Sequence, residues 1–173
     1  MSHDLEKIVN DVVKQVLGVE SSDVKTAPAN AVNNSLVRMT LDAAKKTIEA
    51  VEKKAKEMGV KAVTAISDAG GNPIAVQCMD DAFIASYDIA VNKAFTVVAL
   101  KMPTKNLATL ASPGGSLYGI QFTNNGKIII FGGGEPLYNK DGAIIGGLGV
   151  SGGTAEQDTL LGEYGKAYFE SLT

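Results

Sequence analysis

Histidine and cysteine, which carry much of the chemistry of enzyme and metal sites, are nearly absent from this sequence. Histidine occurs only as His3 and cysteine only as Cys78. Without a histidine in the main domain there is no imidazole for acid–base catalysis there and no Ser-His-Asp triad. The clustered Cys and His residues of a zinc site are absent as well. A single cysteine excludes an internal disulfide and favours a reducing, cytoplasmic location.

Basic charge and long apolar runs are also scarce. Arg38 is the only arginine, and 16 Lys and Arg against 19 Asp and Glu give a formal net charge of −3. Such a chain lacks the basic surface on which nucleic-acid binding depends. No apolar run reaches the roughly 18 to 20 residues that span a bilayer, and the charged N-terminus lacks the apolar centre of a signal peptide. We therefore expect neither a nucleic-acid partner nor a membrane partner.

The first 18 residues carry apolar side chains at helical spacing. The apolar positions are Leu5, Ile8, Val9, Val12, Val13, Val16 and Leu17. Residues 19–35 are small and polar, which is typical of a flexible linker, and residues 36–173 form the main domain. A helix this short is marginal alone in water, so its apolar face is expected to dock. It docks either on its own domain or on another protein, as a detachable targeting helix.

The main domain alternates helical and strand patterns. The expected elements are a helix at 40–58 with Thr40 as its N-cap, a hairpin of strands at 60–67 and 74–79, a helix at 87–101 capped by Ser86, a short helix at 104–111, strands at 127–131, 136–138 and 143–150, and a last helix that begins with a capping box at Thr154 and Gln157. Tight turns between strands predict antiparallel pairing. The sequence therefore predicts an α+β fold, an antiparallel sheet of about five strands flanked by helices.

Glycine is concentrated in one stretch of the main domain. Thirteen of the 19 glycines lie between positions 114 and 153. We predict that the triplet Gly132, Gly133 and Gly134 leaves bare backbone that a flat ligand can approach. The glycines at 147, 149 and 152 match the spacing of a dinucleotide fingerprint, but no second strand follows the next helix, so nucleotide binding is not predicted there.

Two side chains in the main domain have more than one interpretation. Cys78 lies in a predicted strand, where it is either a small buried apolar residue or a metal or haem ligand. Lys93 is the one lysine within a largely apolar helix. It either faces a ligand as a cation or extends its ammonium group to solvent.

Five motifs of the main domain resemble a known family. They read SDAGGN at 67–72, MDDA at 79–82, DIAVNKA at 88–94, FGGGEP at 131–136 and IGGLGVSGG at 145–153. In this order they resemble the haem-binding family that includes GlcG, HbpS and the C-terminal domain of PduO. The resemblance implies an α/β sandwich that assembles into dimers or larger rings, with haem or a related tetrapyrrole as the ligand. Relatives often carry histidine where this chain has Asn72 and Gln77, which leaves Cys78, Met79 and Tyr118 as substitute ligands.

The N-terminal segment resembles the encapsulation peptides of bacterial microcompartments, which are short amphipathic helices on flexible linkers. The leading hypothesis is therefore a non-enzymatic haem-binding accessory protein, a homo-oligomer carried as microcompartment cargo. Its targeting helix is expected to bind shell or cargo proteins. Two alternatives remain open: a structural module of the microcompartment without a cofactor, and a small-molecule enzyme acting on a metabolite such as an aldehyde or a diol.

Overall fold

A computed structural model describes residues 38–172, and the predicted targeting helix (1–18) and linker (19–35) lie outside these residues. The described elements are α2 (Leu41–Glu57), β1 (Val63–Asp68), β2 (Pro73–Cys78), α3 (Ala85–Leu100), α4 (Thr104–Leu110), two short 3-10 turns at Ile120–Phe122 and Asn124–Gly126, β3 (Gly134–Tyr138), β4 (Ile144–Ser151) and α5 (Ala155–Leu172). Within residues 38–172, no helix combines the length and the apolar character needed to cross a membrane.

Helix α2 begins where its sequence predicts. The Thr40 hydroxyl accepts a hydrogen bond from the backbone N–H of Ala43 at 3.2 Å, which satisfies one of the free donors of the first turn. Asp42 in the first turn and Lys54 and Lys56 in the last turn complement the helix dipole. The predicted helix with its Thr40 cap is confirmed.

The strands form one antiparallel sheet in the order β2-β1-β4-β3. Its two central strands, β1 and β4, pair along six residues, from Val63 opposite Ser151 to Asp68 opposite Gly146. The edge strands are β2 and β3. The predicted α+β class and antiparallel sheet are confirmed.

The segment 127–131, which we expected to be another strand, does not join the sheet. Its polar backbone groups are instead bound by a helix side chain. The Thr96 hydroxyl accepts a hydrogen bond from the N–H of Ile129 at 3.0 Å, and its one proton is shared between the carbonyls of Asn92 at 2.7 Å and Lys127 at 3.1 Å. With these backbone groups bound by Thr96 and with Ile128 buried, the segment lies outside the sheet, which has four strands among the described residues.

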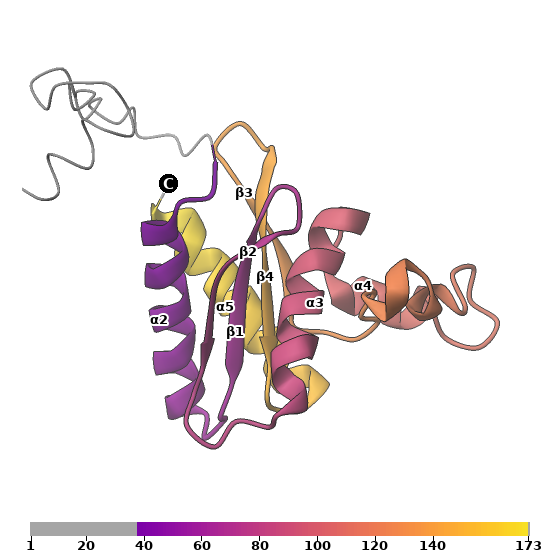
Figure 1. Cartoon of the computed structure of the whole chain (residues 1–173), viewed down its shortest axis with the longest axis horizontal. Coiled ribbons are helices and arrows are strands. Elements are labelled where there is room, and N and C mark those ends of the chain that lie inside the picture. Colours follow the sequence, from indigo (N-terminus) through magenta and orange to yellow (C-terminus); the bar gives the residue numbers. More distant parts are fainter. Residues whose placement is uncertain (1–37, 173) are drawn as a thin grey trace, which may run out of the picture. The chain divides into compact units, whose positions relative to one another are not determined.

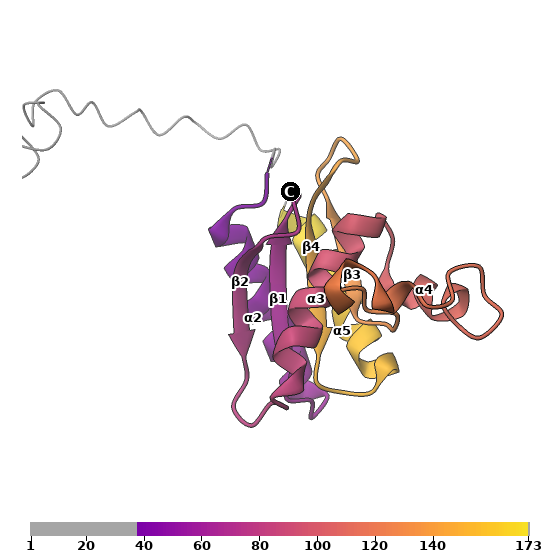
Figure 2. The ribbon, with the colours of Figure 1, turned by 45° about the vertical axis from the view of Figure 1, so that its right-hand side comes forward.

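Helices cover both faces of the sheet, as Figures 1 and 2 show. Helices α2 and α5 pack together on one face, over the larger apolar core, which contains Ile48, Leu148 and Phe169. Helix α3 packs on the other face, mainly against β4 and β1, where Val63, Ala90 and Ala94 form a smaller cluster. The result is a three-layer arrangement with the sheet in the middle.

Helix α3 begins two residues earlier than its sequence pattern predicts, and Ser86 is not its N-cap. Ile84 occupies that position without a side-chain cap. Ser86 is buried under the sheet, where its hydroxyl accepts a hydrogen bond from that of Ser151 at 3.2 Å. The hydroxyl therefore joins α3 to β4 rather than ending the helix.

Candidate functional site

The glycine triplet is enclosed by helices of its own chain. All three glycines are buried. A Cβ atom at Gly132 would lie 1.9 Å from the hydroxyl of Thr159 on α5, and one at Gly134 would lie 2.7 Å from a methyl group of Thr104 on α4. The space left by the missing side chains is therefore filled from within the chain. Where a side chain would project from Gly132 and Gly134, the expectation of bare backbone open to a flat ligand is wrong, because α5 and α4 pack directly against these glycines.

Behind the triplet lies a buried ion pair. Lys93 has a fully buried side chain, and its ammonium donates to the carboxylate of Asp158 at 2.9 Å and to the carbonyl of Val150 at 2.7 Å. The interpretation that Lys93 extends to solvent is wrong. Its position one turn from Ala90 and beside Ala94 directs it under the helix, toward β4 and α5.

The second oxygen of Asp158 and the ammonium group of Lys93 have further partners around the pair. The second oxygen of Asp158 accepts from the N–H of Gly153 at 2.9 Å, and the Lys93 ammonium lies 4.8 Å from the centre of the Phe131 ring. Burial lowers the pKa of Lys93, and the neighbouring Asp158 opposes this shift. Gly133, at φ +108°, allows the chain to pass this close, since a Cβ there would be 2.8 Å from the ammonium nitrogen. The arrangement joins α3, β4 and α5.

Cys78 and Met79 are neighbours in sequence but serve opposite faces of the sheet. Cys78 pairs with Val63, whose side chain belongs to the cluster under α3, so the thiol lies on the α3 face. Met79 packs against the larger core on the α2 face, and its sulfur accepts from the N–H of Ala62 at 3.3 Å. Cys78 is exposed on the edge strand β2, so its interpretation as a buried apolar residue is wrong.

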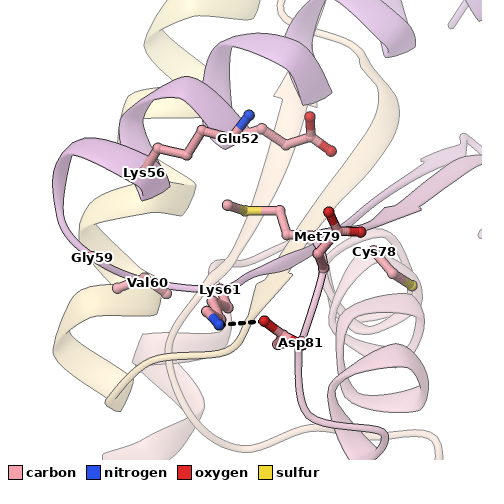
Figure 3. Close-up of a pocket in the computed structure, with 9 residues that line it drawn as sticks. Glu52, Lys56, Gly59, Val60, Lys61, Cys78, Met79 and Asp81 are labelled. Atoms are coloured by element: carbon pink, nitrogen blue, oxygen red, sulfur yellow. Dashed lines mark hydrogen bonds and ion pairs between the residues drawn. The ribbon is translucent and has the colours of Figure 1, made fainter.

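A groove of about 510 Å³ lies where α2 ends and β2 ends. Figure 3 shows Glu52, Lys56 and Met79 around it, with Cys78 directed away from Met79. Lys61 and Asp81 close one end with an ion pair of 2.6 Å, and this bond lowers the pKa of Asp81. Partial burial raises the pKa of the Glu52 carboxyl, and Lys56 opposes this shift. The groove is therefore largely lined by charged groups.

The third predicted ligand, Tyr118, is separate from the other two. It is exposed in the segment between α4 and β3, which projects from the side of α3 opposite to β2 (Figures 1 and 2). One copy of the chain therefore does not bring Tyr118 together with Cys78 or Met79. Lys93, Met79 and Tyr118 remain predictions as cofactor contacts, and Cys78 remains one as a ligand.

Asp158 is the important residue that sequence reasoning missed. In the sequence it is recognisable only as an acidic residue near the start of the last helix, whereas in the fold it is the counter-ion of Lys93. A lysine within an apolar helix is a signal that a buried partner exists. The sequence does not say which of 19 acidic residues is that partner.

The chain is similar to proteins of a known family. A family model described as haem degrading protein HbpS-like matches residues 39–166. The chain belongs to this HbpS-like family. Among its relatives is an uncharacterized 15.0 kDa protein from the dhaT-dhaS intergenic region of Citrobacter freundii, 47% identical over 81% of this chain and 98% of the relative. The corrinoid adenosyltransferase PduO of Citrobacter freundii is 32% identical over 93% of this chain, which spans only 46% of PduO.

Solved structures of HbpS-like proteins share the fold. The PduOC:heme complex is 37% identical, with a TM-score of 0.72, and the match covers 76% of this chain and 94% of that chain. HbpS is 28% identical, with a TM-score of 0.67, over 82% of this chain and 96% of its own. The family resemblance of the five motifs is confirmed.

Proposed function

We propose that this protein is a haem-binding accessory protein and that Cys78 supplies the ligand to the haem iron. The observation that carries the proposal is membership of the HbpS-like family, together with the 37% identity to a protein whose structure contains haem. The adenosyltransferase activity named for PduO is not part of the proposal, because this chain spans less than half of that protein.

The donor chemistry of the described residues fits haem. Residues 38–172 contain no histidine, but thiolate, thioether and phenolate side chains also ligate haem iron in proteins. The Met79 sulfur already accepts a hydrogen bond and packs on the core. The Cys78 thiol is exposed and lies on the same sheet face as half-buried Val76 and Ala82. Of the two sulfur ligands, Cys78 is therefore the one that the fold leaves accessible, beside apolar surface that suits a porphyrin.

Titration of the reduced full-length protein with haemin tests this proposal. We expect a shift of the Soret band that saturates at one haem per chain, with the spectral features of thiolate coordination. Cys78→Ser should remove those features, while the matched variants Met79→Leu and Tyr118→Phe should retain them. An unchanged haemin spectrum at stoichiometric protein would refute haem binding. A normal thiolate spectrum in Cys78→Ser would instead reject only the ligand assignment.

We also propose that the protein travels as bacterial microcompartment cargo. The support is the helical spacing of apolar residues between Leu5 and Leu17, followed by a polar segment ahead of the folded domain. An amphipathic helix of this kind binds an apolar groove or a partner helix. The proposed partners are shell or cargo proteins of the compartment.

A further inference from the structure

Residues 112–127, here called the arm, form an exposed extension between α4 and β3. The backbone–backbone hydrogen bonds of the arm run within it or back to the end of α4, as in Ser112 N–H to the Thr109 carbonyl at 3.4 Å and Leu117 N–H to the Leu110 carbonyl at 2.9 Å. At its other end, the Lys127 carbonyl lies within hydrogen-bond distance of the Thr96 hydroxyl on α3. Figures 1 and 2 show it projecting from the body beside α3. Tyr118 and Phe122 are exposed on it, and Phe122 retains 83% of its surface. Exposed aromatic residues on an extension are typical of an interaction surface.

The surface on this side of the molecule is basic. No Asp or Glu occurs from position 89 to position 134. Of the four lysines in that range, Lys93 is buried with Asp158, and Lys105 is paired with Glu163. Lys101 and Lys127 are exposed, and among residues 38–172 no carboxylate lies within ion-pair distance of either. The Lys127 ammonium lies 5.3 Å from the centre of the Phe95 ring, so its charge is in contact with an aromatic face but is not neutralised by a carboxylate. The arm therefore offers exposed aromatic side chains together with a positive charge at its end.

A second exposed apolar surface has the opposite charge. It consists of residues 80–88, here called the acidic patch, between β2 and the first turn of α3. Its exposed apolar members are Phe83, Ile84 and Tyr87, and Ile84 retains 97% of its surface. Its carboxylates are Asp80, Asp81 and Asp88, of which Asp81 is paired with Lys61. Asp80 and Asp88 are left to attract a cation.

The arm and the acidic patch do not meet within one copy. The patch lies in the segment that runs beneath the sheet into α3, whereas the arm projects sideways from α3 (Figures 1 and 2). Each surface combines exposed aromatic side chains with one sign of charge, and the signs are opposite. Complementary charge around an apolar centre selects a partner and sets its orientation. The surface that complements the arm is therefore present on every other copy of the chain.

We infer that the arm of one copy docks on the acidic patch of a second copy, so that the protein associates with itself through two different surfaces. Tyr118 and Phe122 then lie against Phe83 and Ile84, and Lys127 lies near Asp88. Contacts of this kind either close reciprocally in a pair or continue around a ring. The inference does not depend on haem binding, although the acidic patch begins two residues after Cys78.

Charge reversal tests this contact in the full-length protein. Light scattering after size-exclusion chromatography should show an oligomer for the wild type at about 50 µM, within the range where a weak specific interface is populated. Lys127→Glu and Asp88→Lys should each shift the protein toward the monomer. The double variant, or a one-to-one mixture of the two single variants, should recover the oligomer. The matched controls Lys140→Glu and Asp141→Lys, in the exposed β3–β4 turn, should leave the mass unchanged.

Circular dichroism of each variant separates lost association from lost folding, because exposed substitutions of this kind change stability little. A monomeric wild type, or charge-reversed variants with the wild-type mass, would overturn the inference. Single variants that dissociate without recovery in the double variant would also overturn it, since the two charges would then not face each other. Cys78→Ser should keep the wild-type mass. A loss of haem binding is thereby distinguished from a loss of self-association.

Discussion

Lys93 and Asp158 show how one buried pair connects distant parts of the chain. They are 65 residues apart in sequence, and both side chains are almost fully buried. Two charges removed from water are costly, and the cost is offset only while each has its partner and its other hydrogen bonds. Val150, Gly153 and the Phe131 ring complete the set. Removal of either partner therefore leaves an uncompensated charge.

We expect Lys93→Met to lower the free energy of unfolding by about 3 to 5 kcal/mol, because the Asp158 carboxylate then remains buried without its cation. Adding Asp158→Asn should restore part of this loss. The amide is neutral and still accepts from the N–H of Gly153. Urea denaturation of the wild type, the single variant and the double variant measures both changes.

The exposed pair of Lys46 and Asp42, 2.8 Å apart, is the control for this cycle. Lys46→Met should destabilise the fold far less than Lys93→Met, since solvent-exposed pairs contribute little to stability. If Lys93→Met were no more costly than Lys46→Met, the buried pair would not have the structural role assigned to it.

At the scale of elements, the glycines of β4 set how closely α3 lies on the sheet. A Cβ atom at Gly149 would be 2.0 Å from the carbonyl oxygen of Ala90, and one at Gly147 would be 2.2 Å from that of Ala94. Both of these atoms belong to the backbone of α3, which cannot rotate away as a side chain can. The glycine-rich stretch of the sequence is thus explained in part by a helix that packs directly on bare strand.

We expect Gly149→Ala to destabilise the fold by about 3 kcal/mol or more, because overpacking forces α3 away from β4. Thermal or urea denaturation measures the loss.

Gly142→Ala is the matched control for this prediction. Gly142 has a φ of +78° in the β3–β4 turn, and a Cβ there meets no atom within 4 Å. Only backbone strain opposes that substitution, at about 1 to 2 kcal/mol. An equal loss in both variants would show that contact with α3 does not limit the size of residue 149.

At the scale of the whole molecule, our proposal assigns separate roles to the targeting helix (1–18) and to the folded domain. The domain core runs from Met39 to Phe169. The cargo proposal rests on residues 1–18, whose apolar positions fit one face of a helix.

We expect residues 1–18, fused to a fluorescent protein, to co-purify with microcompartment shells. Charge on the apolar face should abolish this, so Val9→Asp with Val12→Asp should leave the fusion unbound. The matched variant Lys7→Asp with Lys14→Asp also changes charge, but at polar positions, and should bind. Fluorescence in the purified shell fraction is the measurement. Equal recovery of the wild-type and Val9/Val12 fusions would contradict the proposal.

The amino-acid sequence by itself determined the local elements of this protein. The helix that begins after Thr40, the hairpin turn at 68–72 and the capping box of Thr154 and Gln157 all form as their patterns predict. Each depends on residues within about five positions of one another, so the local sequence is sufficient to predict it. The five motifs also identified the family, because each is a short continuous stretch and the five occur in a fixed order along the chain.

Only the tertiary structure decided what these elements do together. Segment 127–131, expected as a strand, is instead bound by Thr96 outside the sheet. The space next to Gly132 and Gly134 is occupied by side chains of α5 and α4. The tertiary structure also gave Lys93 its partner and placed Cys78 on the accessible face of an edge strand. These outcomes depend on which distant segments share a layer. The packing of the whole core determines which segments meet, so the residues next to each site in the sequence do not identify its distant partner.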